Sequence, residues 1–207
     1  MLRTALLAAI VALVPVGVRA QSTPPGPTTS KPAPKPATTA TGDAMGMAPA
    51  MRDEAMIRSA MSAAPPAVAK NATIVKVGPN NVMTRIRNGT NGFTCMADNP
   101  ATPGPDPMCG DANAMAWTQA WIGHKPPAAN KVAFMYMLAG GTDASNTDPY
   151  AQKPTAENSW VKTGPHVMVV GAMAMMQSYP ASPKPNTKEP YVMWAGTPYA
   201  HLMIPVR

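Results

Sequence analysis

The sequence predicts an α+β fold: a single domain with a mainly antiparallel β-sheet, one or two short helices packed on it, and one disulfide. Short apolar or alternating segments recur between residues 72 and 206, separated by turn dipeptides such as Asn88-Gly89. Two further segments carry helix signals, and no regular strand–helix–strand rhythm is present, which disfavours a parallel sheet. The chain has two cysteines, which form a natural pair.

Residues 1–50 differ in composition from the remainder of the chain. Residues 1–20 are typical of a secretory signal peptide, because Arg3 precedes an apolar run and Val18 and Ala20 provide small residues before a cleavage site. That run is about ten residues long, whereas a membrane span needs roughly twenty. Residues 21–50 are rich in Pro, Thr and Ala and lack aromatic residues, which predicts a disordered tether. We therefore expect a secreted or periplasmic chain without a transmembrane segment, whose single folded domain covers residues 51–207.

Two helices are predicted, at residues 52–63 and 111–122. Acidic residues in the first turn favour the first helix, and Pro65-Pro66 end it. Asp111 is a suitable N-cap for the second helix, on which Trp117 and Trp121 share one face.

Strands are predicted from β-branched and alternating segments at residues 72–77, 82–87, 93–95, 131–138, 167–170, 191–194 and 202–206. The segment Lys131–Leu138 is apolar on both of its faces. This pattern predicts a central strand that is covered on both sides.

Cys95 and Cys109 are separated by a Pro-, Gly- and Asp-rich stretch that can fold back on itself. In an oxidising compartment such a pair predicts a disulfide, which stabilises the fold by about 3 kcal/mol in the chain-entropy model.

Charge and motif content narrow the functional classes. From residue 62 onward the chain has eleven Lys and Arg against seven Asp and Glu, with no basic run that includes aromatic residues, so nucleic acid is disfavoured as a partner. The sequence contains no G-x-S-x-G, H-E-x-x-H or Walker-type motif. The expected partner is an unidentified envelope component or a small ligand.

Two segments near the C-terminus repeat one pattern, a His and a Met two residues apart in an apolar run. His166 and Met168 form the first pair, and His201 and Met203 form the second. In a strand, residues i and i+2 point to the same face. The His and Met of each pair therefore share one face, and their apolar neighbours in the strand form the opposite face. Thioethers and imidazoles together favour Cu(I), and Met193 is a further candidate ligand. If the two strands are neighbours, these five residues predict a Cu(I) site.

The sequence leaves other interpretations open. Met is also an adaptable core filler, which is the simpler explanation of these His/Met pairs, so a structural or interaction protein of the cell envelope is an alternative. A small envelope hydrolase that uses His166 or His201 is a further alternative. The segment Gly140–Pro149 is rich in side-chain oxygens, which suits either a hard cation or, more simply, a capped turn.

Three segments, Thr90–Cys95, Ser145–Pro149 and Trp194–Met203, resemble parts of an uncharacterised family of exported bacterial proteins. The resemblance covers about residues 57–206. It implies one exported domain, and it implies no activity or catalytic residue.

Overall fold

A computed structural model describes residues 49–78, 81–100, 102, 104–141 and 143–206, all within one compact unit. The predicted signal peptide and nearly all of the predicted tether lie outside the described residues. The first helix, α1 (Pro49–Ser62), begins three residues before the predicted start.

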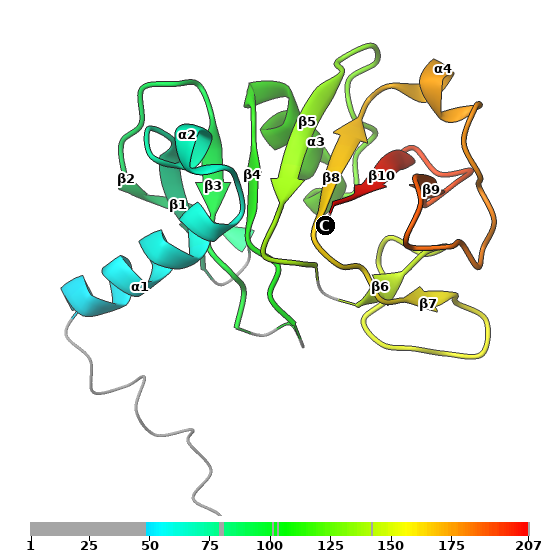
Figure 1. Ribbon diagram of the computed structural model, residues 1–207, viewed down its shortest axis with the longest axis horizontal. Helices are drawn as coiled ribbons and strands as arrows, with labels where there is room; N and C mark the ends of the chain where they lie inside the picture. The colour runs from blue at the N-terminus through cyan, green and yellow to red at the C-terminus, as the bar shows by residue number, and fades with distance from the viewer. Residues whose placement is uncertain (1–48, 79–80, 101, 103, 142, 207) are drawn as a thin grey trace, which may run out of the picture. The chain divides into compact units, whose positions relative to one another are not determined.

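The fold is built on an eight-stranded sheet (Figure 1). Its neighbouring strands are antiparallel, apart from the parallel pair β1–β3. In spatial order the strands are β2 (Met83–Arg87), β1 (Thr73–Val77), β3 (Thr94–Met96), β4 (Met108–Gly110), β5 (Ala133–Met137), β8 (His166–Val170), β10 (His201–Pro205) and β9 (Tyr191–Met193). A separate hairpin pairs β6 (Ala144–Ser145) with β7 (Trp160–Val161). The predicted α+β class with a mainly antiparallel sheet is confirmed.

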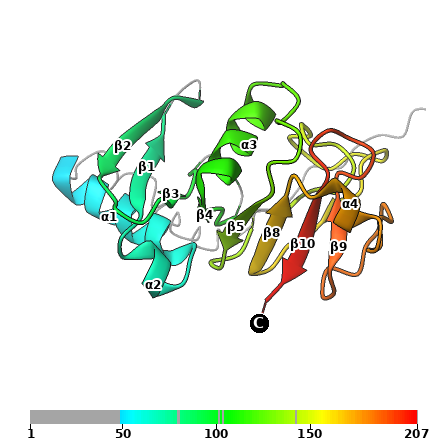
Figure 2. The same cartoon turned by 90° about the horizontal axis from the view of Figure 1, so that it is seen from above.

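The longer helices cover opposite faces of the sheet (Figure 2). The helix α1 and the short α2 (Pro66–Ala69) pack on the face that carries Tyr136, whereas α3 (Ala112–Ile122) packs on the face that carries Met135. The start of α3 is as predicted, because the Asp111 carboxylate accepts a hydrogen bond from the Ala114 N–H at 2.9 Å.

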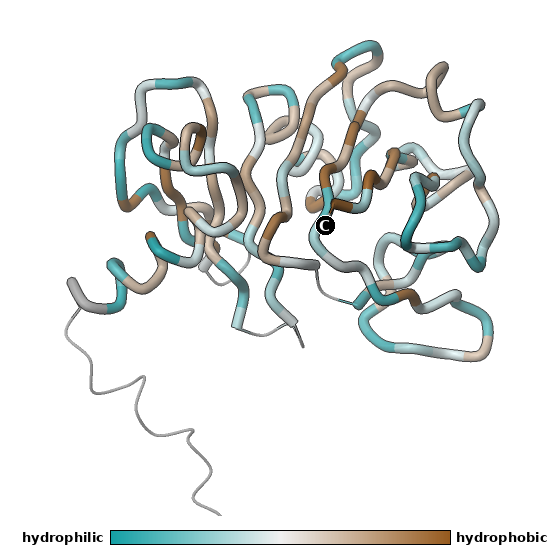
Figure 3. Tube along the Cα trace, viewed as in Figure 1, coloured by the Kyte–Doolittle hydropathy of each residue, from teal (hydrophilic) through white to brown (hydrophobic). Residues whose placement is uncertain are grey.

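The face opposite α3 has a second cluster of buried aliphatic residues over β8, β9 and β10, which includes Val169, Val192 and Leu202. The short α4 (Met173–Met176) contributes Met176 to it. Hydrophobic residues are concentrated on β8 and β10 in Figure 3.

The strand β5 is central, as predicted, but the expectation that both of its faces are covered is wrong. Ala133, Met135 and Met137 are buried, whereas Phe134 on the other face is 51% exposed. The reason is that α1 and α2 reach only as far as Tyr136, and the aliphatic cluster begins on the next strand at Val169.

The predicted disulfide is confirmed. Cys95 on β3 lies directly opposite Cys109 on β4, the two are bonded, and both are fully buried. Across the described ranges, none of the helices has both the length and the apolar character that a bilayer crossing requires.

Candidate functional site

The structure brings the five predicted ligand residues onto one face of the sheet. The strands β8 and β10 are antiparallel neighbours, and Met168 lies directly opposite Met203. His166 and His201 each lie two residues from their methionine, and therefore share its face. Met193 on β9 lies directly opposite His201 and completes the set. This face is the one covered by α3.

The two histidines lie at opposite ends of the central methionine pair. His166 is opposite Pro205, whereas His201 is opposite Val170, four residues further along β8. With a rise of about 3.4 Å per residue, their Cα atoms are about 14 Å apart. Each imidazole therefore has methionines as its immediate neighbours on this face, and the other imidazole is more distant.

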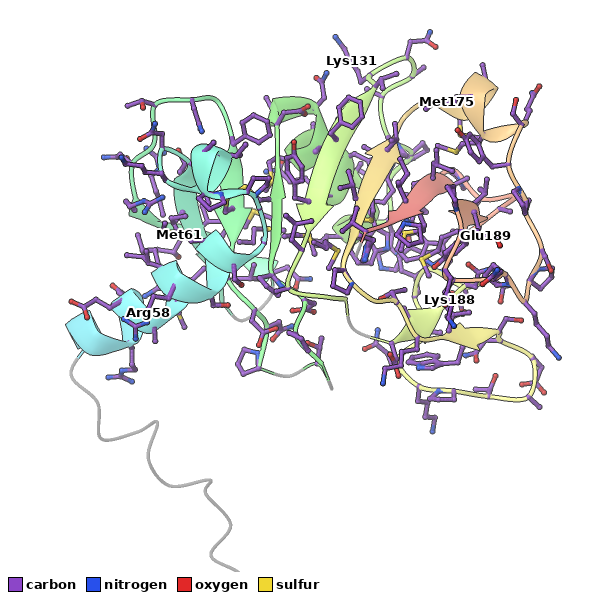
Figure 4. The ribbon with its side chains drawn as sticks, in the orientation of Figure 1. Arg58, Met61, Lys131, Met175, Lys188 and Glu189 are labelled. Atoms are coloured by element: carbon purple, nitrogen blue, oxygen red, sulfur yellow. A yellow bond between two sulfur atoms is a disulfide. The ribbon has the colours of Figure 1, made fainter. Side chains whose placement is uncertain are left out.

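The same face lines a cavity of about 120 Å³. Both histidines line it, together with six methionines: Met108, Met135, Met137, Met168, Met193 and Met203. Figure 4 shows side chains crowded around β8 and β10. Three of the six methionines, on β4 and β5, were not among the predicted ligands.

Met135 and Met137 could have been found only with the strand order in hand. The alternation in residues 131–138 places both on one face, but the sequence does not show that β5 is the neighbour of β8. In the structure, Met135 lies opposite Met168 and Met137 lies opposite His166.

Both imidazoles are held in the same way. The Nδ1 atom of His166 donates to the Gly164 carbonyl at 2.7 Å, and that of His201 donates to the Tyr199 carbonyl at 2.9 Å. Since a carbonyl can only accept, Nδ1 carries the proton and Nε2 keeps a lone pair. Neither Nε2 atom hydrogen bonds to any residue that the structure describes.

Burial keeps these imidazoles neutral. His201 is 1% exposed, and burial lowers its pKa to about 4. Burial also lowers the pKa of His166, which is 3% exposed. The neutral imidazole is the form that binds a metal ion, so both side chains are ready to act as ligands at neutral pH.

Two tryptophans enclose the His201 end of the cavity. The His201 ring meets Trp117 edge-on, with ring centroids 5.4 Å apart, and meets Trp194 edge-on at 4.8 Å. Trp194 is fixed by its indole N–H, which donates to the Ser145 carbonyl at 2.9 Å. These rings pack around the His201 imidazole, and a cation near their faces gains from the aromatic quadrupole.

One carboxyl group lines the cavity. The Asp106 carboxylate accepts from the Asn99 N–H at 2.9 Å, and the Asp106 N–H donates to the Asp98 carboxylate at 2.7 Å. Burial raises the pKa of Asp106 to about 6, and the neighbouring Asp98 adds to the increase.

The arrangement required by the hydrolase alternative, an imidazole hydrogen-bonded to a carboxylate, is not found at His166 or His201 among the described residues, because both Nδ1 atoms bond to backbone carbonyls. The described part of the chain also has no group of three or more His, Cys, Asp or Glu side chains that suits a metal ion. The cavity gathers six thioethers and two imidazoles, together with the Asp106 carboxyl group.

The oxygen-rich segment Gly140–Pro149 uses side chains to cap a turn. The Ser145 hydroxyl accepts from the N–H groups of Thr147 and Asp148, and the Asp148 carboxylate accepts from the Tyr150 N–H. These hydrogen bonds support the capped-turn interpretation of the described residues of this segment.

Comparisons of the chain with protein-family models, with curated proteins and with solved structures found no match.

Proposed function

We propose that this protein is an exported, non-enzymatic binding protein that holds Cu(I) in the cavity beneath α3. The observation that carries the proposal is the lining of that cavity by six thioethers and two neutral imidazoles, each with an Nε2 lone pair that no described residue uses.

The ligands at the His201 end are His201, Met203 and Met193. Met203 follows His201 by two residues on the same face, and Met193 lies directly opposite His201. Directly opposite side chains have Cβ atoms about 4.5–5.5 Å apart, which suits a shared ion. Thioether and imidazole donors favour the soft Cu(I) ion over Zn²⁺, Mg²⁺ or Ca²⁺.

Secretion or a periplasmic location belongs to the same proposal. It is supported by the signal-like composition of residues 1–20 and by the disulfide, since disulfides persist in oxidising compartments.

A competition titration tests the binding. The metal-free protein, under reducing and anaerobic conditions, is titrated against a coloured Cu(I) chelator. We expect the wild type to withdraw at least one Cu(I) per chain. The double variant Met193→Leu/Met203→Leu, which preserves side-chain volume, should lose the ion at the His201 end.

A matched control carries the same chemical change outside the cavity. Met173 and Met175 on α4 are 53% and 41% exposed, and Met175 lies at the periphery of the fold (Figure 4). Met173→Leu/Met175→Leu should bind Cu(I) like the wild type. A wild-type protein that takes no copper from the chelator refutes the proposed function.

A further inference from the structure

The methionine and histidine positions obey a local two-fold symmetry that is visible only in the strand register. Met168 and Met203 lie directly opposite each other on antiparallel strands, so a local two-fold axis passes between them. This axis relates His166, two residues before Met168, to His201, two residues before Met203.

The outer strands extend the same symmetry. On β5, next to β8, Met137 lies directly opposite His166. On β9, next to β10, Met193 lies directly opposite His201. Each histidine is therefore flanked by one methionine two residues along its own strand and by a second methionine on the outer strand.

The hydrogen bonds of the two imidazoles are equivalent too. Each Nδ1 donates to the carbonyl two residues earlier in the chain, Gly164 for His166 and Tyr199 for His201. Each ring is thus fixed in one tautomer with its Nε2 atom available, and each is at least nine-tenths buried.

We infer that the cavity binds two Cu(I) ions, one in each symmetry-related set of one imidazole and two thioethers. This inference rests on the proposed function. The first set is His201, Met203 and Met193, and the second is His166, Met168 and Met137. Two ions fit the register better than one shared ion, because each histidine has its own two methionines as neighbours and the two histidines lie at opposite ends of the Met168–Met203 pair.

The surroundings of the two sets differ, which makes the ions distinguishable. The His201 ring contacts Trp117 and Trp194. The His166 ring lies against Gly141, where an added Cβ would meet its Cε1 atom at 2.8 Å. An ion in the first set should therefore quench tryptophan fluorescence more strongly than an ion in the second.

Ag(I), a redox-inert soft ion, is a suitable probe for NMR of the histidine rings. The chain has three histidines. The third, His124, stacks on Tyr150 with ring centroids 3.9 Å apart and does not line the cavity, so it is an internal control. The wild type should bind two Ag(I), with the signals of His166 and His201 shifting and that of His124 unchanged.

Single variants that conserve side-chain volume show which ligand set holds each ion. Met137→Leu should bind one Ag(I) and retain the shift of His201, whereas Met193→Leu should bind one and retain the shift of His166. Met173→Leu/Met175→Leu should still bind two. Circular dichroism of each variant checks that the fold is retained.

The outcomes separate the inference from the proposed function. One Ag(I) per wild-type chain, or an unchanged stoichiometry in Met137→Leu, overturns the two-ion inference and leaves the Cu(I) proposal standing. A wild type that binds neither Ag(I) nor Cu(I) overturns both.

Discussion

Acidification of the metal-free protein should reveal the buried imidazole of His201 as a loss of stability. An ordinary histidine has a pKa of 6.5, and burial lowers that of His201 to about 4. Between these pH values the unfolded chain takes up a proton on this residue and the folded chain does not. The free energy of unfolding therefore falls as the pH falls from 6.5 to 4. At about 1.36 kcal/mol per pH unit, the loss from His201 is about 3 kcal/mol, and the lowered pKa of His166 acts in the same direction.

Asp106 acts in the opposite direction over nearly the same range. Its pKa rises from 3.8 to about 6 through burial, so the folded chain binds this proton more tightly than the unfolded chain. Its contribution to stability is complete below pH 3.8 and is lost as the pH rises through 6. Because the side chain is partly exposed, solvent screening makes this contribution smaller than that of His201.

The variant Asp106→Asn removes the opposing contribution and sharpens the test. Unfolding in guanidinium chloride, followed by tryptophan fluorescence at several pH values from neutral to 4, measures the free energy of unfolding. We expect a steeper acid loss in Asp106→Asn than in the wild type. Glu157→Gln, which changes an exposed carboxylate, should follow the wild type. If Asp106→Asn keeps its full stability between pH 6.5 and 4, the assignment of buried neutral histidines is refuted.

Three further predictions concern the scaffold. Cys95→Ala/Cys109→Ala should lose about 3 kcal/mol of stability in denaturant unfolding, and an unchanged midpoint would contradict a stabilising role for the disulfide. Gly171 has a φ of +71°, and an added Cβ would collide with the Lys131 carbonyl oxygen, so Gly171→Ala should cost about 3 kcal/mol. Gly164→Ala is its control, since nothing lies within 4 Å of a Cβ there, and equal melting temperatures for the two variants would contradict the clash. Asp111→Ala should cost about 1 kcal/mol through loss of the α3 cap, measured by thermal unfolding, whereas Asp111→Asn should retain most of that stability.

Local features of the fold were predictable because local chemistry determines them. The cap of α3 at Asp111 and the pairing of Cys95 with Cys109 follow from nearby residues, and both are present in the structure. The alternation of residues also predicted correctly that the His and Met of each pair lie on one face of the sheet and that their apolar neighbours lie on the other, as the register of β8 and β10 shows.

Strand order and register were beyond the sequence because they depend on pairing between distant segments. Nothing in residues 131–138 indicates that β5 pairs with β8, so Met137 could not be placed opposite His166. The prediction that both faces of β5 are covered was wrong for a related reason. Phe134 is apolar, but it lies between two buried clusters that other elements of the fold form, and neither cluster covers it.

The distribution of methionine over the two faces of the sheet bears on whether these residues are only core filler. On β5, β8, β9 and β10, every methionine is on the cavity face: Met135, Met137, Met168, Met193 and Met203. The opposite face of the same four strands is built from other residues: Phe134, Tyr136, Val167, Val169, Val192, Leu202 and Ile204. Several of these, such as Leu202, are as deeply buried as the methionines. If methionine on these four strands merely replaced leucine, thioethers would be expected on both of their faces, since burial makes the same demand on each. Thioethers do pack over the opposite face, but they come from helices, for example Met176 of α4. The methionines of these four strands thus share the face that carries both buried histidines, which is the placement that the proposed Cu(I) site requires.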